Sequence, residues 1–285
     1  MSAPPLRHRP KHRLGQNFLH DVRVRDQIVA AAELTGADTI LEIGPGRGFL
    51  TSALLDAGPE RVVAVELDRS LSPYLDPVLI ANPNFSVVWG DFLKTPWDSL
   101  GLGDGAGTKV VANIPYYITT PILLNLLQAD RLAREPLESV APRAERIILM
   151  VQWEVAQRLL ASPGRKDFGS LSLIAQYAAE VSLVTRVPAG AFRPRPEVDS
   201  AVVMLKPRRT SPVPLRSPAM LSRVIRGAFQ QRRKTLRNAL LATGIMRERL
   251  EAVAQAQGLD LMRRAETLSL AEFAALADAL EAPPV

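Results

Sequence analysis

The fold is decided by the stretch Leu41-Glu42-Ile43-Gly44-Pro45-Gly46-Arg47-Gly48, in which a short apolar run leads directly into glycines at every second position. A glycine-rich turn between a buried strand and the following helix lets the backbone approach a ligand closely. Phe49 occupies the position where a dinucleotide-binding turn has its third glycine, and this bulky residue counts against a pyrophosphate ligand. The turn therefore favours a nucleoside ligand over a nicotinamide dinucleotide, with a plain tight turn as the alternative.

On both sides of this stretch, apolar runs alternate with helical patterns. Short runs rich in β-branched residues predict buried strands at 38–43, 61–66, 84–89, 109–112, 146–152, 181–187 and 200–206. Helical patterns lie at 21–34, 49–57, 71–79, 121–127, 153–160 and 171–179. Strand alternating with helix predicts an α/β fold with a doubly wound, Rossmann-like sheet.

The pattern changes after residue 206. The stretch 206–218 is rich in proline, which is typical of a linker, with prolines at 207, 212, 214 and 218. Only helical patterns follow, at 218–229, 235–241, 247–257 and 269–280. The sequence therefore predicts an α/β domain with a basic N-terminal segment over residues 1–208, and a small all-helical domain over residues 209–285.

Composition excludes several kinds of site. The 285 residues include no cysteine, so disulfides and thiolate metal sites are excluded. All three histidines precede the first predicted helix, which leaves the fold without histidines for a metal centre or a Ser-His-Asp triad. Neither an apolar run long enough to span a membrane nor a secretion signal is present. We therefore expect a cytoplasmic protein that binds no metal and no membrane. We also expect it to be a monomer.

The charge is distributed unevenly along the chain. Residues 1–25 carry +5 and residues 206–250 carry +11, so the rest of the chain carries −10 of the net +6. An acidic body with two basic segments suggests a polyanionic partner such as a nucleic acid. The alternative is a solvated basic surface.

Carboxylates follow the next two predicted strands. Glu66 ends the second strand, and Asp91 follows the third with Phe92 beside it. An acid at the end of the second strand of a doubly wound sheet hydrogen-bonds a ribose diol, and an acid over the same crevice is placed to accept from an adenine amino group. Together with Gly44 and Gly46, these residues predict a site for S-adenosylmethionine.

The fourth predicted strand leads into Asn113-Ile114-Pro115-Tyr116. This tetrapeptide resembles the Asn-Pro-Pro-Tyr type sequence of methyltransferases that act on exocyclic amino groups of bases. An adenine N6 is a poor nucleophile because its lone pair is delocalised into the ring. If the Asn113 side-chain oxygen and the Ile114 carbonyl accept its N–H bonds, the nitrogen moves toward tetrahedral geometry and can attack a methyl group. Tyr116 would stack on the base.

The resemblance extends along nearly the whole chain. Its motifs are RLGQNFL at 13–19, the glycine turn at 43–49, the tetrapeptide at 113–116, FGSLS at 168–172, FRPRPEVDS at 192–200 and QRRKTL at 231–236. Together they are similar to the KsgA-type small-subunit ribosomal RNA adenine dimethyltransferases. The resemblance implies transfer of four methyl groups from S-adenosylmethionine to the N6 atoms of two adjacent adenosines. These lie in the hairpin loop near the 3′ end of 16S rRNA, in the small subunit or its assembly intermediate.

The resemblance also implies roles for individual residues. Asn17 and Leu19 would cover the cofactor, and Phe192 would stack on the base opposite Tyr116. The cofactor site would be lined by Gly44, Gly46, Glu66, Asp91, Phe92 and Asn113. Contact with RNA is expected from Arg232, Arg233, Lys234 and Arg237, with a solvated helix as the alternative. One departure is a longer, proline-containing loop at 134–145.

Two other functions stay open at this point. Antibiotic-resistance methylases of large-subunit rRNA share the Asn-x-Pro-aromatic tetrapeptide, but Tyr116 and the motifs at 192–200 and 231–236 favour the small-subunit enzymes. A non-catalytic RNA-binding assembly factor is the other alternative. The intact cofactor and tetrapeptide residues argue against it as the only role.

Overall fold

The structure of the chain is a computed structural model that describes residues 10–11, 15–102, 107–141, 143–231 and 233–281. Arg232, one of the four cations expected to contact RNA, lies outside these residues. So does most of the basic N-terminal segment, including the first two residues of the motif at 13–19.

The chain divides into two compact units. The first consists of Met1–Leu126, Arg143–Ala156 and Ser182–Pro207, and the second consists of Leu127–Pro142, Gln157–Val181 and Arg208–Val285. The chain enters the second unit for the last time after Pro207. This position is next to the domain boundary predicted at residue 208. Two earlier segments that the sequence analysis assigned to the α/β domain belong to the second unit. The division into a catalytic domain at 1–208 and an RNA-contacting domain at 209–285 stays a prediction.

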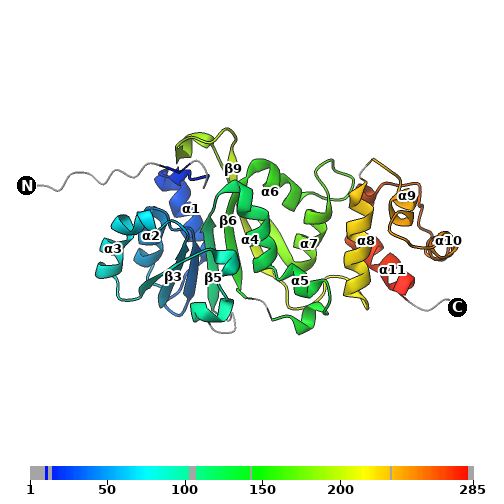
Figure 1. The fold of residues 1–285 in the computed structure, drawn as a ribbon, viewed down its shortest axis with the longest axis horizontal. Helices are drawn as coiled ribbons and strands as arrows, with labels where there is room; N and C mark the ends of the chain where they lie inside the picture. Colours follow the sequence, from blue (N-terminus) through cyan, green and yellow to red (C-terminus); the bar gives the residue numbers. More distant parts are fainter. Residues whose placement is uncertain (1–9, 12–14, 103–106, 142, 232, 282–285) are drawn as a thin grey trace, which may run out of the picture. The chain divides into compact units, whose positions relative to one another are not determined.

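Seven strands of the described chain form one sheet in the order β4-β3-β2-β5-β6-β9-β7 (Figure 1). Their bounds are β2 Thr39–Ile43, β3 Arg61–Glu66, β4 Phe85–Trp89, β5 Thr108–Asn113, β6 Arg146–Gln152, β7 Ala179–Val187 and β9 Ser200–Pro207. The strands β2 to β6 pair in parallel, and β9 is antiparallel to β6. The doubly wound α/β fold predicted from the sequence is confirmed.

The central strands are buried on both faces. Almost every residue of β2, β3, β5 and β6 is buried, whereas β7 at the edge is mostly half-buried or exposed. Continuous apolar runs suit strands that are covered on both sides, which explains why these strands were found within one or two residues. Because β2 to β5 are parallel, their carboxyl ends at Ile43, Glu66, Trp89 and Asn113 meet at one edge of the sheet.

Helices of the first unit pack around this sheet. They are α1 Val22–Ala32, α2 Phe49–Asp56, α3 Ser72–Ala81 and α4 Thr119–Leu126. Asp21 caps α1 by accepting hydrogen bonds from the backbone N–H groups of Arg23 and Val24. Ile28 of α1 and Leu54 of α2 belong to one apolar core with the sheet residues. These helices hold the strand ends in fixed positions.

Two short strands were not predicted. The strand β1 (Phe18–Leu19) pairs antiparallel with β8 (Phe192–Arg193), with Leu19 opposite Phe192. The backbone N–H of His20 extends the pairing by donating to the Ala191 carbonyl at 3.0 Å. Strands this short carry no periodicity that a sequence could reveal. The pairing fastens the segment that follows Gly15 to the first unit.

The second unit is built mainly of helices. They are α5 Ala129–Leu132, α7 Ser170–Ala178, α8 Pro218–Gln230, α9 Leu236–Leu241, α10 Arg247–Ala256 and α11 Leu270–Glu281, while α6 Trp153–Leu160 begins in the first unit. Short 3-10 helices occur in both units. Those of the first unit are Arg69–Leu71, Phe92–Lys94, Trp97–Leu100, Tyr116–Ile118 and Ala189–Ala191, and those of the second are Leu137–Ser139 and Ala265–Thr267. Ser217 caps α8, and Ser269 and Glu272 form a capping box before α11. In the described chain, no helix combines the length and the apolar character that crossing a membrane would require.

Candidate active site

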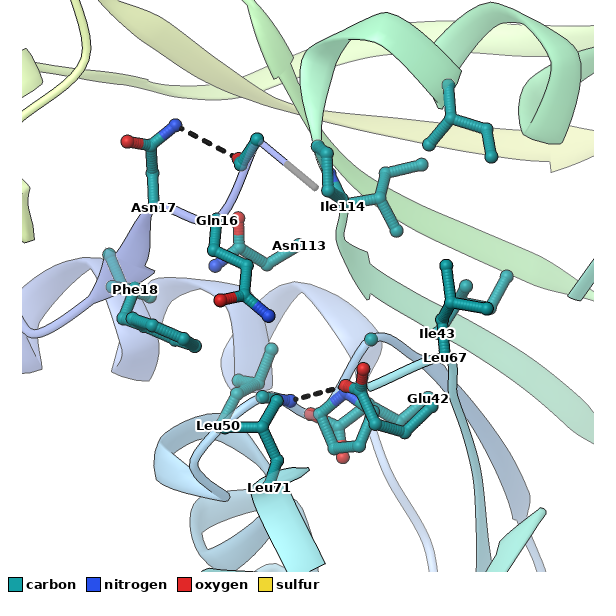
Figure 2. A pocket seen from close by; sticks show the side chains of 18 of the residues that line it. Gln16, Asn17, Phe18, Glu42, Ile43, Leu50, Leu67, Leu71, Asn113 and Ile114 are labelled. Atoms are coloured by element: carbon teal, nitrogen blue, oxygen red, sulfur yellow. Dashed lines mark hydrogen bonds between the residues drawn. The ribbon is translucent and has the colours of Figure 1, made fainter. Parts of the chain in front are cut away.

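A cavity of about 350 Å³ opens at the carboxyl ends of β2 to β5. Its volume lies in the lower part of the range of small-molecule sites. In Figure 2, Gln16, Asn17 and Phe18 of the N-terminal segment and Asn113 and Ile114 of β5 and its following turn contribute side chains to it. Every residue predicted to bind the cofactor or act on the base lines this cavity: Asn17, Leu19, Gly44, Gly46, Glu66, Asp91, Phe92, Asn113, Ile114, Pro115, Tyr116 and Phe192.

The glycine turn between β2 and α2 lies close to its neighbours. Gly44 and Gly46 have φ angles of +75° and +59°, which residues with side chains rarely adopt. A Cβ atom at Gly46 would stand 3.2 Å from the ring of Phe18. The Gly44 N–H donates to the Val65 carbonyl at 2.9 Å. Both positions therefore favour glycine for their conformation, and at Gly46 a side chain would also be crowded by Phe18.

Glu66 is held by the backbone around it. One carboxylate oxygen accepts the Gly46 N–H at 3.1 Å, and the other accepts the Asp68 N–H at 2.8 Å. Burial raises the pKa of Glu66, although these two backbone N–H groups oppose the rise. The Leu67 N–H also acts on this carboxylate, and because a carboxylate offers about four acceptor positions, acceptor capacity is left for a ligand. This geometry suits a pair of neighbouring hydroxyl groups.

Asp91 and Phe92 form the next part of the wall. The Asp91 carboxylate accepts the Leu93 N–H at 3.0 Å and lies 3.9 Å from the Lys94 ammonium. Phe92 is buried at the start of the following 3-10 helix. The cap fixes the carboxylate beside an apolar ring, an arrangement that fits the edge of a purine.

The tetrapeptide presents one unpaired polar side chain to the cavity. Asn113 ends β5, and its side-chain amide has no hydrogen-bond partner among the residues that the structure describes. Ile114 is buried, and Pro115 directly precedes the 3-10 helix Tyr116–Ile118. Figure 2 shows Asn113 facing the interior of the cavity. A half-buried amide without a protein partner is available to a ligand.

Tyr116 is fixed by its hydroxyl group. The phenolic oxygen lies 2.7 Å from the hydroxyl of Ser200 at the start of β9. Burial raises the pKa of the Tyr116 phenol, and the hydrogen bond to Ser200 opposes that rise. The ring is therefore neutral and held in place, as a stacking surface requires. Phe192 is 2% exposed and belongs to the core with Leu19, so its expected stacking on the base stays a prediction.

A polar cluster of Lys11, Gln16 and Asp68 was missed by the sequence analysis. The Lys11 ammonium lies 2.5 Å from one Asp68 oxygen, and the Gln16 amide donates to the other at 2.8 Å. Although burial opposes it, hydrogen bonds from Lys11, Ser70 and Gln16 hold the pKa of Asp68 well below its usual range. The cluster ties the N-terminal segment to the end of β3 and so closes one wall of the cavity.

Glu42 was also missed. It lies in β2 beneath the glycine turn, is 1% exposed, and accepts the Thr51 hydroxyl at 2.7 Å. Burial raises the pKa of Glu42 to about 8, and the nearby Glu66 carboxylate adds to the rise. Its signal in the sequence is a single acid inside an apolar strand. Because its pKa is raised to about 8, Glu42 carries a proton at neutral pH.

This proton predicts a pH-dependent stability. Folded Glu42 stays protonated up to pH about 8, whereas in the unfolded chain it loses its proton near pH 4.5. The folded state then binds more protons between these values, so stability falls as the pH rises through them. We expect Glu42→Gln to raise the melting temperature of the ligand-free protein by roughly 5 °C at pH 8 and by much less at pH 5. The exposed Glu60→Gln is the control, and an equal gain at both pH values would contradict this assignment.

Comparison with known families identifies the kind of enzyme. Over residues 7–281, the sequence matches the model of the family described as Ribosomal RNA adenine dimethylase. The chain belongs to this family. The protein is therefore an enzyme that transfers methyl groups. Its tetrapeptide and its glycine turn line the same cavity, as a methyl transfer between two bound molecules requires.

Relatives of this ribosomal RNA adenine dimethylase cover most of its length. The Ribosomal RNA small subunit methyltransferase A of Clostridium perfringens is 42% identical over 94% of this chain and 90% of the relative. The protein of the same name from Pelotomaculum thermopropionicum is 45% identical, with the same two coverages.

Two solved structures share the fold. A dimethyladenosine transferase from Plasmodium falciparum superimposes with a TM-score of 0.71 at 24% identity, covering 90% of this chain and 95% of that one. The 23S rRNA methyltransferase ErmE gives a TM-score of 0.70 at 26% identity, covering 93% of this chain and all of that one. These likenesses support the fold predicted for a methyltransferase.

Proposed function

We propose that this dimethylase transfers methyl groups from S-adenosylmethionine to the N6 atoms of two adjacent adenosines in the hairpin loop near the 3′ end of 16S rRNA. The proposal rests on the side-chain amide of Asn113. This amide has no hydrogen-bond partner among the described residues, and it lies in the same cavity as the glycine turn and the Glu66 carboxylate. Relatives at 42% and 45% identity are named for the small subunit, whereas the 23S rRNA enzyme is 26% identical. This difference favours the small-subunit target.

The residues of the cavity fit S-adenosylmethionine. The remaining acceptor capacity of Glu66 suits a ribose hydroxyl, and Asp91 with Phe92 suits the adenine. Gly44 and Gly46 leave room for close approach of the ligand, and Asn17 and Leu19 would cover it. When bound, S-adenosylmethionine supplies an electrophilic methyl group on a sulfonium.

The chain's own residues would prepare the adenine for attack. The Asn113 side-chain oxygen and the Ile114 carbonyl would accept the two N6–H bonds and hold the nitrogen with its lone pair directed at the methyl group. Tyr116, fixed by Ser200, would stack on a base drawn out of its hairpin. Positioning then supplies most of the catalysis. No general base with a tuned pKa is required, which agrees with the confinement of all three histidines to the segment before α1.

The proposed setting follows from the substrate. The enzyme would act in the cytoplasm as a monomer on the small subunit or its assembly intermediate, without a metal and away from membranes. The test is to incubate the protein with methyl-labelled S-adenosylmethionine and small subunits that lack the modification, and then to digest the RNA to nucleosides. Label in N6,N6-dimethyladenosine is expected. Label only with large-subunit RNA, or RNA binding without label, would contradict the proposal.

The residues predicted to contact RNA differ in whether their charge is exposed or paired with an acid. Arg233 and Lys234 are exposed, whereas the Arg237 guanidinium forms an ion pair with Glu251. Each cation that neutralises a phosphate contributes about 0.7 to 0.9 to the slope of log affinity against log salt concentration. We expect replacement of Arg232, Arg233 and Lys234 by Ala to weaken RNA binding and to reduce this slope by about 2 to 3. Arg237→Ala should change it less, and an unchanged slope in the triple variant would indicate a solvated helix.

A further inference from the structure

A second hollow lies within the second unit. It has a volume of about 450 Å³, and we call it the α5–α8 groove after Asp130 and Arg134 on one side and Ser222, Arg223, Arg226 and Gln230 on the other. Arg134 belongs to the loop at 134–145 that the sequence predicted to be longer than the family pattern. Its α8 side lies within the basic segment 206–250, but among the described residues none of the individual residues predicted above to bind cofactor, adenine or RNA lines this groove.

The α8 side of the groove is a regular stripe. Arg223, Arg226 and Gln230 are exposed and follow one another at spacings of three and four positions, which places them on one face of the helix. The opposite face of α8 is buried in the core of the unit through Leu221, Val224 and others. Packing therefore fixes the helix that carries the stripe.

The floor of the groove brings two segments close together. A Cβ atom at Gly227 would stand 2.4 Å from the methyl group of Thr243. Arg223 donates to the Thr243 carbonyl at 3.1 Å, which uses one of its five N–H donors. The position of at least one cation is thus set before any ligand binds.

The charge of the groove is largely uncompensated. Among the residues that the structure describes, neither Arg134 nor Arg226 has an acidic partner within 4 Å. Neighbouring arginines differ, because Arg131 pairs with Glu135 and Arg216 pairs with Asp278. Of the described residues that line the groove, Asp130 is the one acid, against three arginines. Such a site favours an anion with several negative groups in a row.

We infer that the α5–α8 groove binds the phosphodiester backbone of the substrate RNA, at a place separate from the predicted contact at 232–237. Planar guanidinium groups bind phosphate through paired N–H donors, and Ser222 and Gln230 add neutral donors along the same path. The described part of the wall contains no large apolar side chain that would anchor a protein partner. The inference rests on the proposed function, because RNA is the polyanion that this enzyme is proposed to modify.

The first test removes two charges from the groove. We compare Arg134→Ala/Arg226→Ala with Arg131→Ala/Arg216→Ala, which removes two paired charges from the same unit. Binding of each full-length protein to protein-free small-subunit rRNA is measured as a function of salt concentration. The groove variant is expected to bind about tenfold more weakly and to lose about 1.4 to 1.8 from the salt slope, with unchanged affinity for S-adenosylmethionine. Equal slopes in both variants and the wild type would overturn the inference.

The second test uses the absence of cysteine from this chain. A photo-crosslinker attached to Arg226→Cys is expected to label rRNA in small subunits, whereas the same group on Arg131→Cys labels it less. Crosslinks to ribosomal protein alone would point to an acidic protein partner and overturn the inference. Dimethyladenosine formation by the wild type is measured in parallel. If the wild type methylates while the groove variant binds RNA normally, only the groove assignment fails; if it does not methylate, the proposed function fails.

Discussion

Asn113→Ala is expected to lose methyl transfer by about 100- to 1,000-fold while RNA binding survives. The Asn113 amide faces the cavity without a protein partner among the described residues. Its oxygen would accept one N6–H bond of adenine, and without it the nitrogen stays planar and its lone pair stays delocalised. The measurement is incorporation of labelled methyl groups into small subunits at saturating cofactor, together with the dissociation constant for RNA.

A conservative variant separates chemistry from shape. Asn113→Asp keeps an oxygen acceptor at the same position, so we expect it to retain more activity than Asn113→Ala. If both variants are equally inactive, the acceptor is not what the reaction needs. If Asn113→Ala loses RNA binding and methyl transfer in equal measure, Asn113 contributes to RNA binding rather than to the chemical step.

The strand ends of the site could be predicted because their signals are local. Central parallel strands are continuous apolar runs, so Glu66 and Asn113 were placed at strand ends from the sequence alone. In the structure each is the last residue of its strand. Parallel pairing then brings these ends to one edge, a step that needs only the fold class. This is why the predicted residues that end or follow the parallel strands, from Gly44 to Tyr116, line one cavity.

The remaining parts of the site depend on contacts between distant segments. Gln16 and Asp68 are 52 residues apart in sequence, and nothing in either neighbourhood indicates that they form a hydrogen bond. Pairing of Leu19 with Phe192 likewise joins two very short strands. Burial of Phe192 follows from this pairing, so its exposure could not be judged from the sequence. The second unit takes in residues 157–181, although their predicted helices continue the alternating pattern of the α/β segments before them.

Glu66→Gln is expected to weaken binding of S-adenosylmethionine about 100-fold. Both oxygens of the Glu66 carboxylate accept backbone N–H groups, from Gly46 and from Asp68. An amide replaces one oxygen by a nitrogen that carries two donors, and this nitrogen would face one of those N–H groups. The side chain would lose that contact and also one acceptor for the ribose diol, and each such charged hydrogen bond contributes about 1.5 to 3 kcal/mol. Isothermal titration calorimetry with the intact protein measures the effect.

The control for this prediction is Glu60→Gln, the same change at an exposed position directly before β3. It should bind S-adenosylmethionine like the wild type, because Glu60 precedes the strand whose carboxyl end meets the cavity. Thermal denaturation of both variants separates loss of the ligand contact from loss of the fold. A Glu66→Gln protein that melts like the wild type and binds S-adenosylmethionine with unchanged affinity would remove Glu66 from the cofactor site. The ribose would then have to be held elsewhere in the cavity, with Asp91 as the remaining carboxylate that follows a strand end on its described wall.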